Sequence, residues 1–307
     1  MESKPHIVVG DCRTLLEPKA FREKFLREVD LTFLDPPFNQ DKEYAEWDDD
    51  LPEEEYWKRM QEVCHNVYEV TNAGGAIYFM QREKKAERVL QCLRESGWTF
   101  QNLIIWKKKT SAVPGVTRYG KHYQIIAFAT KGKRARVFHR LRIDPPLPKG
   151  YRYEREDGMY VTDVWDDIRE LTSGYFAGDE ALRDKKGNRI HKQQSPIQLL
   201  LRIILSSTKP GDVVLDPFAG TGTTLVVANQ LQRIPLGIEL DKENVKLIKQ
   251  RLEAERDADN IMKFYKEYEH TEGLKEIWAL SEQSMKRAEG RKSRAKQQTL
   301  FESATHT

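Results

Sequence analysis

The sequence predicts an α/β protein built on a mostly parallel sheet. Short apolar runs alternate with helical segments through most of the 307 residues, which is typical of βαβ units. Two of the apolar runs end in loops rich in functional groups. The first loop is Asp35-Pro36-Pro37-Phe38, and the second is a glycine-rich loop that begins at Asp216, about 180 residues later.

Each element follows from its local sequence. Strands are predicted over 6–11, 31–34, 75–80, 101–106, 123–129, 213–215 and 235–239. Helices are predicted over 52–69, 82–95, 197–206 and 225–231, and from a cap at Asp241 to about Arg256. The first of these helices has acids in its first turn, where the helix dipole favours them. Ser195 is the expected cap of helix 197–206, with Pro196 at the first helical position.

Two stretches depart from this regular pattern. The connection between strands 101–106 and 123–129 is basic, contains Pro114, Gly115 and Gly120, and is predicted to be a mobile arm. From 131 to about 190 prolines, glycines and aromatic residues are interleaved with Arg and Lys, which indicates an inserted, less regular subdomain. After Gly290 the chain is basic and polar, so we expect disorder there.

Charge is concentrated rather than large overall. The net charge is +3, but residues 107–155 hold 14 Lys and Arg against 2 acids, a local charge of +12, and residues 41–55 hold nine acids and one Lys. The basic stretch is either a solvated face or a surface that contacts phosphates. Three cysteines without CxxC spacing indicate neither a metal site nor a disulfide framework. No signal peptide, with a charged region followed by an apolar one, is recognised at the N-terminus. The apolar run 199–205 is too short to span a bilayer. A cytoplasmic location is therefore expected.

The glycine-rich loop is suited to a nucleotide-like cofactor. Its sequence is Asp216-Pro217-Phe218-Ala219-Gly220-Thr221-Gly222-Thr223-Thr224, and glycines after a buried strand permit a sharp turn and close approach of the backbone to a ligand. Leu225 occupies the third glycine position of the NAD fingerprint, and no Lys follows the glycines as in a phosphate loop. Glu239, at the next strand end, is placed to accept from two ribose hydroxyls; a solvated strand-end acid is the alternative.

The proline loop is suited to an exocyclic amine. Proline fixes the backbone, removes N–H donors and leaves carbonyl oxygens to accept. Asp35 and the Pro36 carbonyl can accept one amine hydrogen each and direct the nitrogen lone pair out of conjugation with the ring. Phe38 can stack on the base, an interaction worth about 1–3 kcal/mol. A simple surface turn is the alternative interpretation.

In combination, the loops resemble the beta class of S-adenosylmethionine-dependent DNA amino-methyltransferases, in which the amine loop comes first. The resemblance covers most of residues 5–255. It implies a Rossmann-like sheet, mostly parallel with one antiparallel strand, and a circularly permuted motif order. Cys12, Cys64 and Cys92 lack the Pro-Cys context of C5-cytosine enzymes, which favours methylation of an amine. The catalytic candidates are Asp35, Pro36, Pro37 and Phe38.

The resemblance also implies the cofactor site. Phe218 is expected against S-adenosylmethionine, Thr223 and Thr224 near its methionine carboxylate, and Asp11 near its adenine. Gln194 and Pro196 match the family's helix-start segment, whereas Lys192 and Ser195 depart from it, and His122-Tyr123-Gln124 departs from the usual His-Glu. The cofactor-binding candidates are Asp11, Cys12, Gln194, Ser195, Pro196, Asp216, Phe218, Gly220, Thr221, Gly222, Thr223, Thr224 and Glu239.

The organisation that follows has five parts. A catalytic half (1–132) precedes a target-recognition insertion (133–190), a cofactor-binding half (191–256), a helical extension (257–290) and a disordered basic tail (291–307). The amine lies inside the duplex, so the base must be flipped into the site. The candidates for contacts with double-stranded DNA are Lys107, Lys108, Lys109, Arg118, Lys121, Lys133, Arg134 and Arg136.

Several substrate assignments stay open. Adenine N6 is favoured over cytosine N4, because a leading Asp is commoner in the adenine enzymes. An enzyme that acts on RNA or a protein amide, and a non-catalytic DNA-binding protein, are the rivals. A homodimer is possible. The tail residues Gln297, Leu300 and Phe301 resemble the peptide by which bacterial replication proteins dock on the sliding clamp.

Overall fold

The computed structural model describes residues 5–279, except for 41–48, 111–112, 145–156, 172–177, 185 and 191–193. The tail with its clamp-like peptide lies outside the described residues. The elements in chain order are β1 (His6–Val9), α1 (Cys12–Leu15), α2 (Pro18–Phe25), β2 (Val29–Leu34), α3 (Glu53–Val70), β3 (Thr71–Arg82), η1 (Glu83–Lys85), α4 (Ala86–Glu95), β4 (Thr99–Lys107), β5 (Tyr123–Thr130), β6 (Arg142–Ile143), β7 (Met159–Tyr160), β8 (Val164–Trp165), α5 (Ile197–Ser207), β9 (Val213–Asp216), α6 (Thr223–Gln230), β10 (Ile234–Glu239), α7 (Lys242–Glu253), η3 (Asp257–Asp259), η4 (Ile261–Tyr268) and α8 (Leu274–Ile277).

The main sheet has eight strands in the order β1-β10-β9-β2-β3-β5-β4-β8. Strand β5 runs antiparallel to both of its neighbours, and the other neighbouring pairs in this sheet are parallel. The expected fold class, with one antiparallel strand, is therefore confirmed. The order proceeds outward from the β9–β2 pair, to β10 on one side and β3 on the other. The carboxyl ends of β2 and β9 thus flank a topological switch point, where α/β sheets bind ligands.

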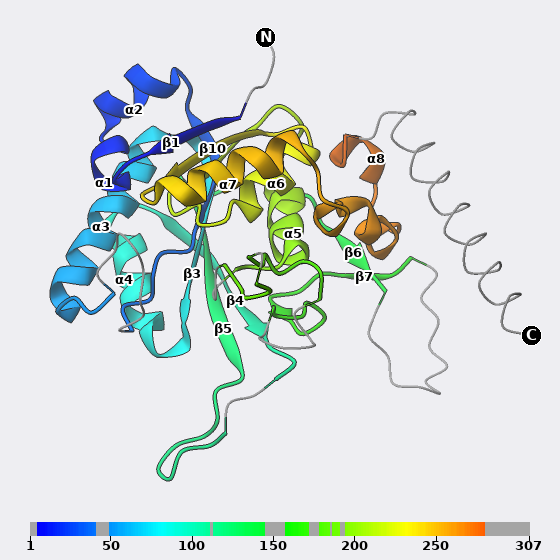
Figure 1. Cartoon of the computed structure of the whole chain (residues 1–307), viewed down its shortest axis with the longest axis horizontal. Coiled ribbons are helices and arrows are strands. Elements are labelled where there is room, and N and C mark those ends of the chain that lie inside the picture. Colours follow the sequence, from blue (N-terminus) through cyan, green and yellow to red (C-terminus); the bar gives the residue numbers. More distant parts are fainter. Residues whose placement is uncertain are drawn as a thin grey trace, which may run out of the picture.

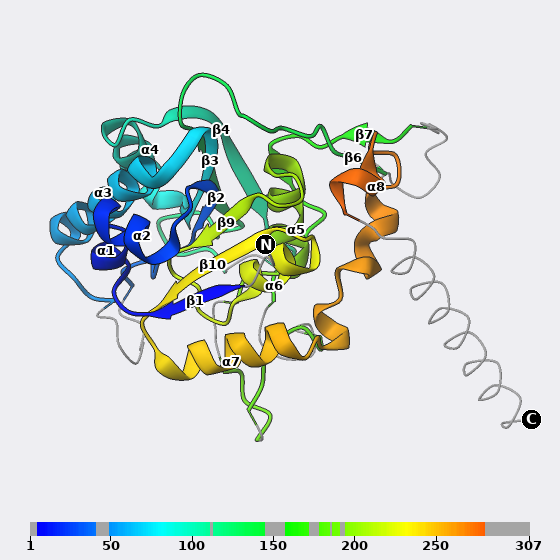
Figure 2. The ribbon, with the colours of Figure 1, turned by 90° about the horizontal axis from the view of Figure 1, so that it is seen from above.

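Helices cover both faces of the sheet (Figures 1 and 2). Helices α1–α4 pack on one face, and α5, α6 and residues 261–278 pack on the other. Consecutive strand residues point to opposite faces, so in β2 Phe33 joins the core with α5 while Leu34 joins the core with α3. Because both faces are covered, β2 is buried along its whole length.

Helix α5 begins differently from the prediction. Pro196 is the residue before the helix rather than its first residue, and no side chain of its own caps it. The Oε1 atom of Glu180 accepts from the Ile197 N–H at 2.5 Å instead, and burial raises the pKa of Glu180. The expected cap by Ser195 is therefore wrong, because a carboxylate from the preceding insertion satisfies this helix terminus and the Ser195 hydroxyl is used elsewhere.

The other boundaries differ by smaller amounts. Helix α7 ends at Glu253 rather than near Arg256, because Ala254 adopts an extended backbone conformation. The short helices α1 and α2 were not predicted. The latter ends where Leu26 takes a left-handed conformation, with φ of 53°. None of the helices in the described ranges has both the length and the apolar character needed to cross a bilayer.

The insertion and the C-terminal extension both join the main body. Strand β8 extends the sheet by pairing in parallel with β4, and the Trp106 indole donates to the Ile168 carbonyl at 3.0 Å. The described part of the extension is largely 3₁₀ rather than α-helical. Its Tyr268 and Trp278 are buried in the core under α5, so residues 257–279 complete the fold.

Candidate active site

Three strand ends place the predicted site residues along one edge of the sheet. Asp35 follows β2, while Asp216 and Glu239 end β9 and β10. Strand β1 brings Asp11 to the same edge, because Val9 pairs with Glu239 and the Gly10 N–H donates to the Glu239 carbonyl at 3.0 Å. The two loops, far apart in the chain, therefore face the same switch point.

A buried tyrosine on α3 binds the backbone of the proline loop. The Tyr56 hydroxyl on α3 donates to the Pro37 carbonyl at 2.8 Å and accepts from the Gln81 amide at 3.0 Å. Tyr56 is fully buried, and burial raises its pKa well above the usual value. The Tyr56 bond thus fixes the backbone next to Pro36, whose carbonyl stays the predicted acceptor for the amine.

A second support lies on the far side of the loop. Asn39 takes a left-handed conformation, with φ of 54°, which Asn tolerates better than most residues. The buried Asp49 carboxylate accepts from the Asn39 and Gln40 N–H groups at 2.7 and 3.0 Å, and the Asn39 amide exchanges two hydrogen bonds with the Leu51 backbone. These supports were missed from the sequence, where the Asn directly after Phe38 was the available signal.

The proline loop is also joined to the start of the cofactor half. The Ser195 hydroxyl donates to Oδ2 of Asp35 at 3.1 Å. Phe38 is 8% exposed and packs into the core with α5. Ser195, which departs from the family pattern, thus contacts the predicted catalytic carboxylate and is a candidate for orienting Asp35.

The glycine-rich loop requires its glycines. Gly220 and Gly222 have left-handed backbones, with φ of 51° and 80°. A Cβ on Gly222 would lie 2.7 Å from Cγ1 of Ile248 on α7, so a side chain there meets both backbone strain and a packed neighbour. Helix α6 starts directly after Gly222, and its first N–H groups form an electropositive helix terminus at the strand end.

Two carboxyl groups flank this loop, the buried Asp216 and the partly buried Glu239. Glu239 accepts from the Gly220 N–H at 2.6 Å and from the Asp241 N–H at 2.9 Å, and burial raises its pKa. Asp216 accepts from the Phe218 N–H at 3.1 Å, and burial raises its pKa to about 7. These bonds fix the loop against both strand ends and keep the Glu239 carboxylate at the edge.

Other predicted cofactor residues have partners within the protein. Asp11 is bound by the Arg13 guanidinium, which lowers the pKa of this carboxyl although burial opposes the change. The Gln194 amide donates to the Glu180 carbonyl and accepts from the Leu182 N–H, both at 3.1 Å. Gln194 therefore ties the insertion to the start of α5. Cys12 is buried in the core with α3.

One polar atom at the start of α6 fits a bound anionic group. Within the described residues, the buried Thr223 Oγ1 has no hydrogen-bond partner. A buried hydroxyl is normally satisfied, and this one lies at the helix terminus that favours a carboxylate. The residues present therefore fit the methionine end of S-adenosylmethionine, and Glu239 fits its ribose.

The predicted DNA contacts separate into two groups on opposite edges. Lys107, Lys108, Lys109, Arg118 and Lys121 lie at the carboxyl edge of β4 or on the β4–β5 connection, here called the arm (residues 108–122). Because β5 is antiparallel, the chain after Thr130 emerges at the other edge, about 23 Å away for a strand of this length. Lys133, Arg134 and Arg136 follow there, so they do not lie at the edge that carries Asp35 and Asp216.

Arg136 shows the separation most directly. Its guanidinium pairs with Asp30 at 2.9 Å and Asp212 at 2.6 Å. Both acids stand at the amino ends of β2 and β9, opposite Asp35 and Asp216. Arg136 therefore stabilises the fold at the amino edge.

The arm is anchored at its root and exposed at its tip. Glu170, from the insertion, accepts from the Lys109 and Thr110 N–H groups at 2.8 and 2.9 Å, and Lys121 pairs with Glu83 at 2.9 Å. The described part of the arm extends away from the sheet (Figure 1). Val113, Val116 and Tyr119 are 90% or more exposed there, close to the exposed Arg118.

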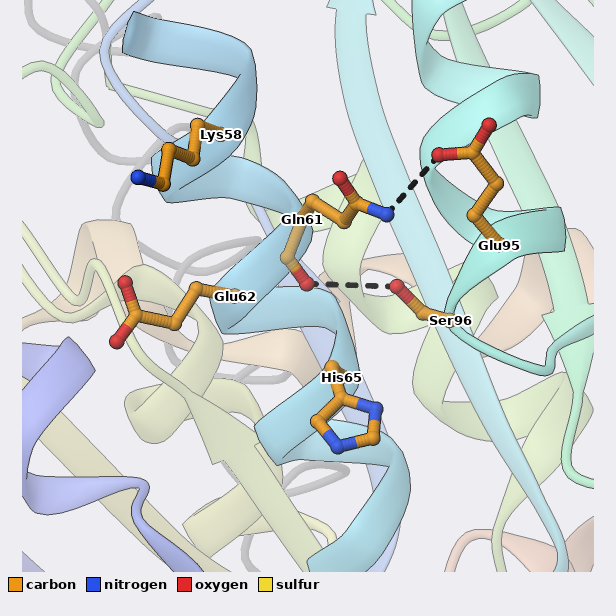
Figure 3. A pocket seen from close by; sticks show the side chains of 6 residues that line it. All are labelled: Lys58, Gln61, Glu62, His65, Glu95 and Ser96. Carbon is orange, nitrogen blue, oxygen red and sulfur yellow. Dashed lines mark hydrogen bonds between the residues drawn. The ribbon is translucent and has the colours of Figure 1, made fainter.

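A surface hollow lies between α3 and the end of α4 (Figure 3). The Gln61 amide donates to Glu95 at 2.9 Å, and the Ser96 hydroxyl donates to the Gln61 carbonyl at 3.4 Å. Its other lining residues are Lys58, Glu62 and His65. It contains none of the predicted site residues and has no part in the site.

The fold and the two facing loops define a Rossmann-like methyltransferase. The model of the DNA methylase family, N6/N4 type, matches residues 29–250. The chain is 30% identical to the type II methyltransferase M.HpaI of Haemophilus parainfluenzae over 238 residues, 77% of this chain and 72% of that protein. It is 32% identical to the DNA adenine methyltransferase YhdJ of Escherichia coli K12 over 247 residues, 73% of this chain and 76% of that protein. The crystal structure of M1.HpyAVI with SAM has a TM-score of 0.55 at 22% identity, over 82% of this chain and all of that one. The chain belongs to the N6/N4 DNA methylase family.

Proposed function

We propose that this DNA amino-methyltransferase transfers a methyl group to N6 of adenine in a specific sequence of duplex DNA. The observation that carries the proposal is the shared switch point, where the Asp35 loop and the Gly220–Thr224 loop meet. Two further points favour adenine over cytosine N4. The loop begins with Asp, and the similar protein YhdJ is a DNA adenine methyltransferase.

The residues of the chain divide the chemistry between them. When bound, S-adenosylmethionine supplies an electrophilic methyl group. Gly220, Gly222, Thr223 and Glu239 would hold this cofactor. Asp35 and the Pro36 carbonyl accept the two amine hydrogens, which aligns the nitrogen lone pair and removes it from conjugation. Positioning of this kind lowers the barrier without a covalent nucleophile, and Asp35 or water then takes the released proton.

The DNA surface in this proposal is the arm together with the carboxyl edge of β4. Lys107 and Arg118 are exposed there and suit phosphate contacts, which fix the position of the duplex without reading sequence. The insertion supplies the sequence readout. RNA would be the substrate instead if single-stranded RNA competed with a duplex that contains the methylated site.

The test is to express the enzyme in a methylation-deficient host and to sequence the genome by a single-molecule method sensitive to modified bases. We expect one motif fully marked as N6-methyladenine. The same pattern as N4-methylcytosine would preserve the mechanism and overturn the base. Unmodified DNA from cells that contain active cofactor-binding protein would overturn the proposal of a site-specific DNA enzyme.

Two assemblies are proposed in addition. Gln297, Leu300 and Phe301 are proposed to dock the enzyme on the sliding clamp, which a pull-down with purified clamp would test. Capture that is unchanged by Leu300→Ala and Phe301→Ala would contradict this interaction. A homodimer is proposed from the family resemblance, and light scattering in solution at several concentrations measures its mass.

A further inference from the structure

We propose that Arg251 and Asp259, which lie beyond the segment matched by the family model, are positioning residues for the cofactor loop. The match ends at residue 250. The next residue, Arg251 on α7, donates from Nη1 to the Thr221 carbonyl at 2.5 Å. Thr221 stands between the two glycines of the loop, so the last turn of α7 binds the loop backbone directly.

The arginine that makes this contact also belongs to a buried ion pair. Arg251 donates from Nε and Nη2 to the two carboxylate oxygens of Asp259 at 3.0 and 2.9 Å. The two side chains are only 2% and 0% exposed. This bidentate pair leaves Nη1 directed at Thr221, because the guanidinium is planar and its donors have fixed directions. Asp259 therefore sets the orientation from which Arg251 holds the loop.

One peptide group of the loop is held on both sides, by Arg251 on one and by the loop backbone on the other. The carbonyl of the Thr221–Gly222 peptide accepts from Arg251, and its N–H donates to the Ala219 carbonyl at 2.7 Å. Ile248, one turn before Arg251 on the same helix face, fills the space that a Gly222 side chain would need. The peptide is thus held in the orientation that starts α6 and presents its N-terminal groups to the cofactor.

Residues 257–261 of the C-terminal extension are also bound to helix α6. The Gln230 amide at the end of α6 donates to the Asp259 carbonyl at 2.8 Å and accepts from the Ile261 N–H at 3.0 Å. Residues 257–261 therefore bridge the end of α6 and the end of α7. The loop between β9 and α6 is therefore held by Arg251 and residues 257–261, which the family match does not include.

The inference rests on the proposed placement of S-adenosylmethionine at this loop. The experiment measures the dissociation constant of S-adenosylmethionine by calorimetry, together with kcat and both KM values, on the full chain. For Asp259→Asn we expect the dissociation constant and the KM for the cofactor to rise at least tenfold, while the KM for DNA stays within twofold. Arg251→Lys keeps the positive charge but loses the planar guanidinium that binds Asp259 and Thr221 together. This variant should therefore give a smaller rise in the dissociation constant and in the KM for the cofactor.

The matched control is the pair formed by the buried Arg202 and the partly buried Asp167, in which Arg202 Nη1 donates to Oδ1 of Asp167 at 2.9 Å. It joins α5 to the insertion, so Asp167→Asn should lower the melting temperature without changing cofactor affinity. Equal losses of affinity in Asp259→Asn and Asp167→Asn would overturn the inference, as would unchanged affinity in both Asp259→Asn and Arg251→Lys. If Asp259→Asn does not fold, Arg251→Lys decides alone. Glu239→Ala separates the two proposals: retained cofactor binding in that variant would contradict the proposed site itself.

Discussion

Asp35 and Ser195 are 160 positions apart in the chain, yet their side chains share a hydrogen bond. We predict that Asp35→Asn lowers the single-turnover rate of methylation at least about 100-fold, because it removes the anionic acceptor of the amine. Ser195→Ala should lower the rate by about tenfold, the equivalent of one lost hydrogen bond. Cofactor affinity should change little in Asp35→Asn.

The control is Ser96→Ala, which changes a serine in the hollow of Figure 3. If Ser195→Ala methylated DNA as fast as this control, Ser195 would not orient Asp35.

Asp216 predicts a pH dependence of stability. Burial raises its folded pKa to about 7 from a usual value of 3.8, so the native protein retains a proton that the unfolded chain releases. Stability therefore falls as pH rises from about 4 to 7, and the loss persists above pH 7. The full shift corresponds to at most ~4 kcal/mol.

Asp216→Asn tests this dependence. The Asn amide can keep bonds to the Phe218 N–H and to the Thr224 hydroxyl, but it cannot ionise. In urea unfolding without cofactor, the variant should gain stability relative to the wild type as pH rises from 4 to 7. A difference between the two proteins that is constant across this range would refute the assignment.

At the scale of elements, the direction of β5 divides the basic residues into two groups. We predict that Lys107→Ala and Arg118→Ala each weaken duplex binding and reduce the slope of log K against log salt by about 0.9, the value for one phosphate contact. Lys133→Ala and Arg134→Ala should leave both quantities unchanged, because they lie at the opposite edge. Titrations of one labelled duplex at several salt concentrations measure all four variants. Equal effects from the two pairs would contradict this arrangement.

The same element shows what sequence pattern can and cannot provide. Apolar runs located β2, β3, β5, β9 and β10 because burial of both sheet faces leaves a continuous local signal. The pattern does not specify which edge of the sheet a following loop occupies, since that depends on strand direction and partner. Lys133 and Lys121 are therefore close in the sequence and opposed in the structure.

At the scale of the whole molecule, the sequence located the loops of the candidate site but not the residues that support these loops. Asp35, Gly222 and Glu239 belong to compact motifs at strand ends. Tyr56 and Glu180 each bond to a distant backbone group, and Asp259 accepts two bonds from the Arg251 side chain. No local spacing in the sequence marks such pairings. The packing of the predicted helical extension (257–290) was not foreseen for the same reason, because Tyr268 and Trp278 join the core against the distant helix α5.

Residues 257–279 should therefore be indispensable for the whole domain. The buried Arg233 donates to the Ile277 carbonyl at 2.8 Å. Removal of residues 257–279 would also remove Tyr268 and Trp278 from the core, and loss of one large buried aromatic side chain costs about 3–5 kcal/mol. A chain that ends at residue 279 should melt cooperatively and methylate a short duplex at the full-length rate. A chain that ends at residue 256 would expose the α5 face of the core, and we expect it to lose cooperative unfolding in calorimetry. A cooperative transition near the full-length temperature in the shorter chain would show that the extension is an independent appendage.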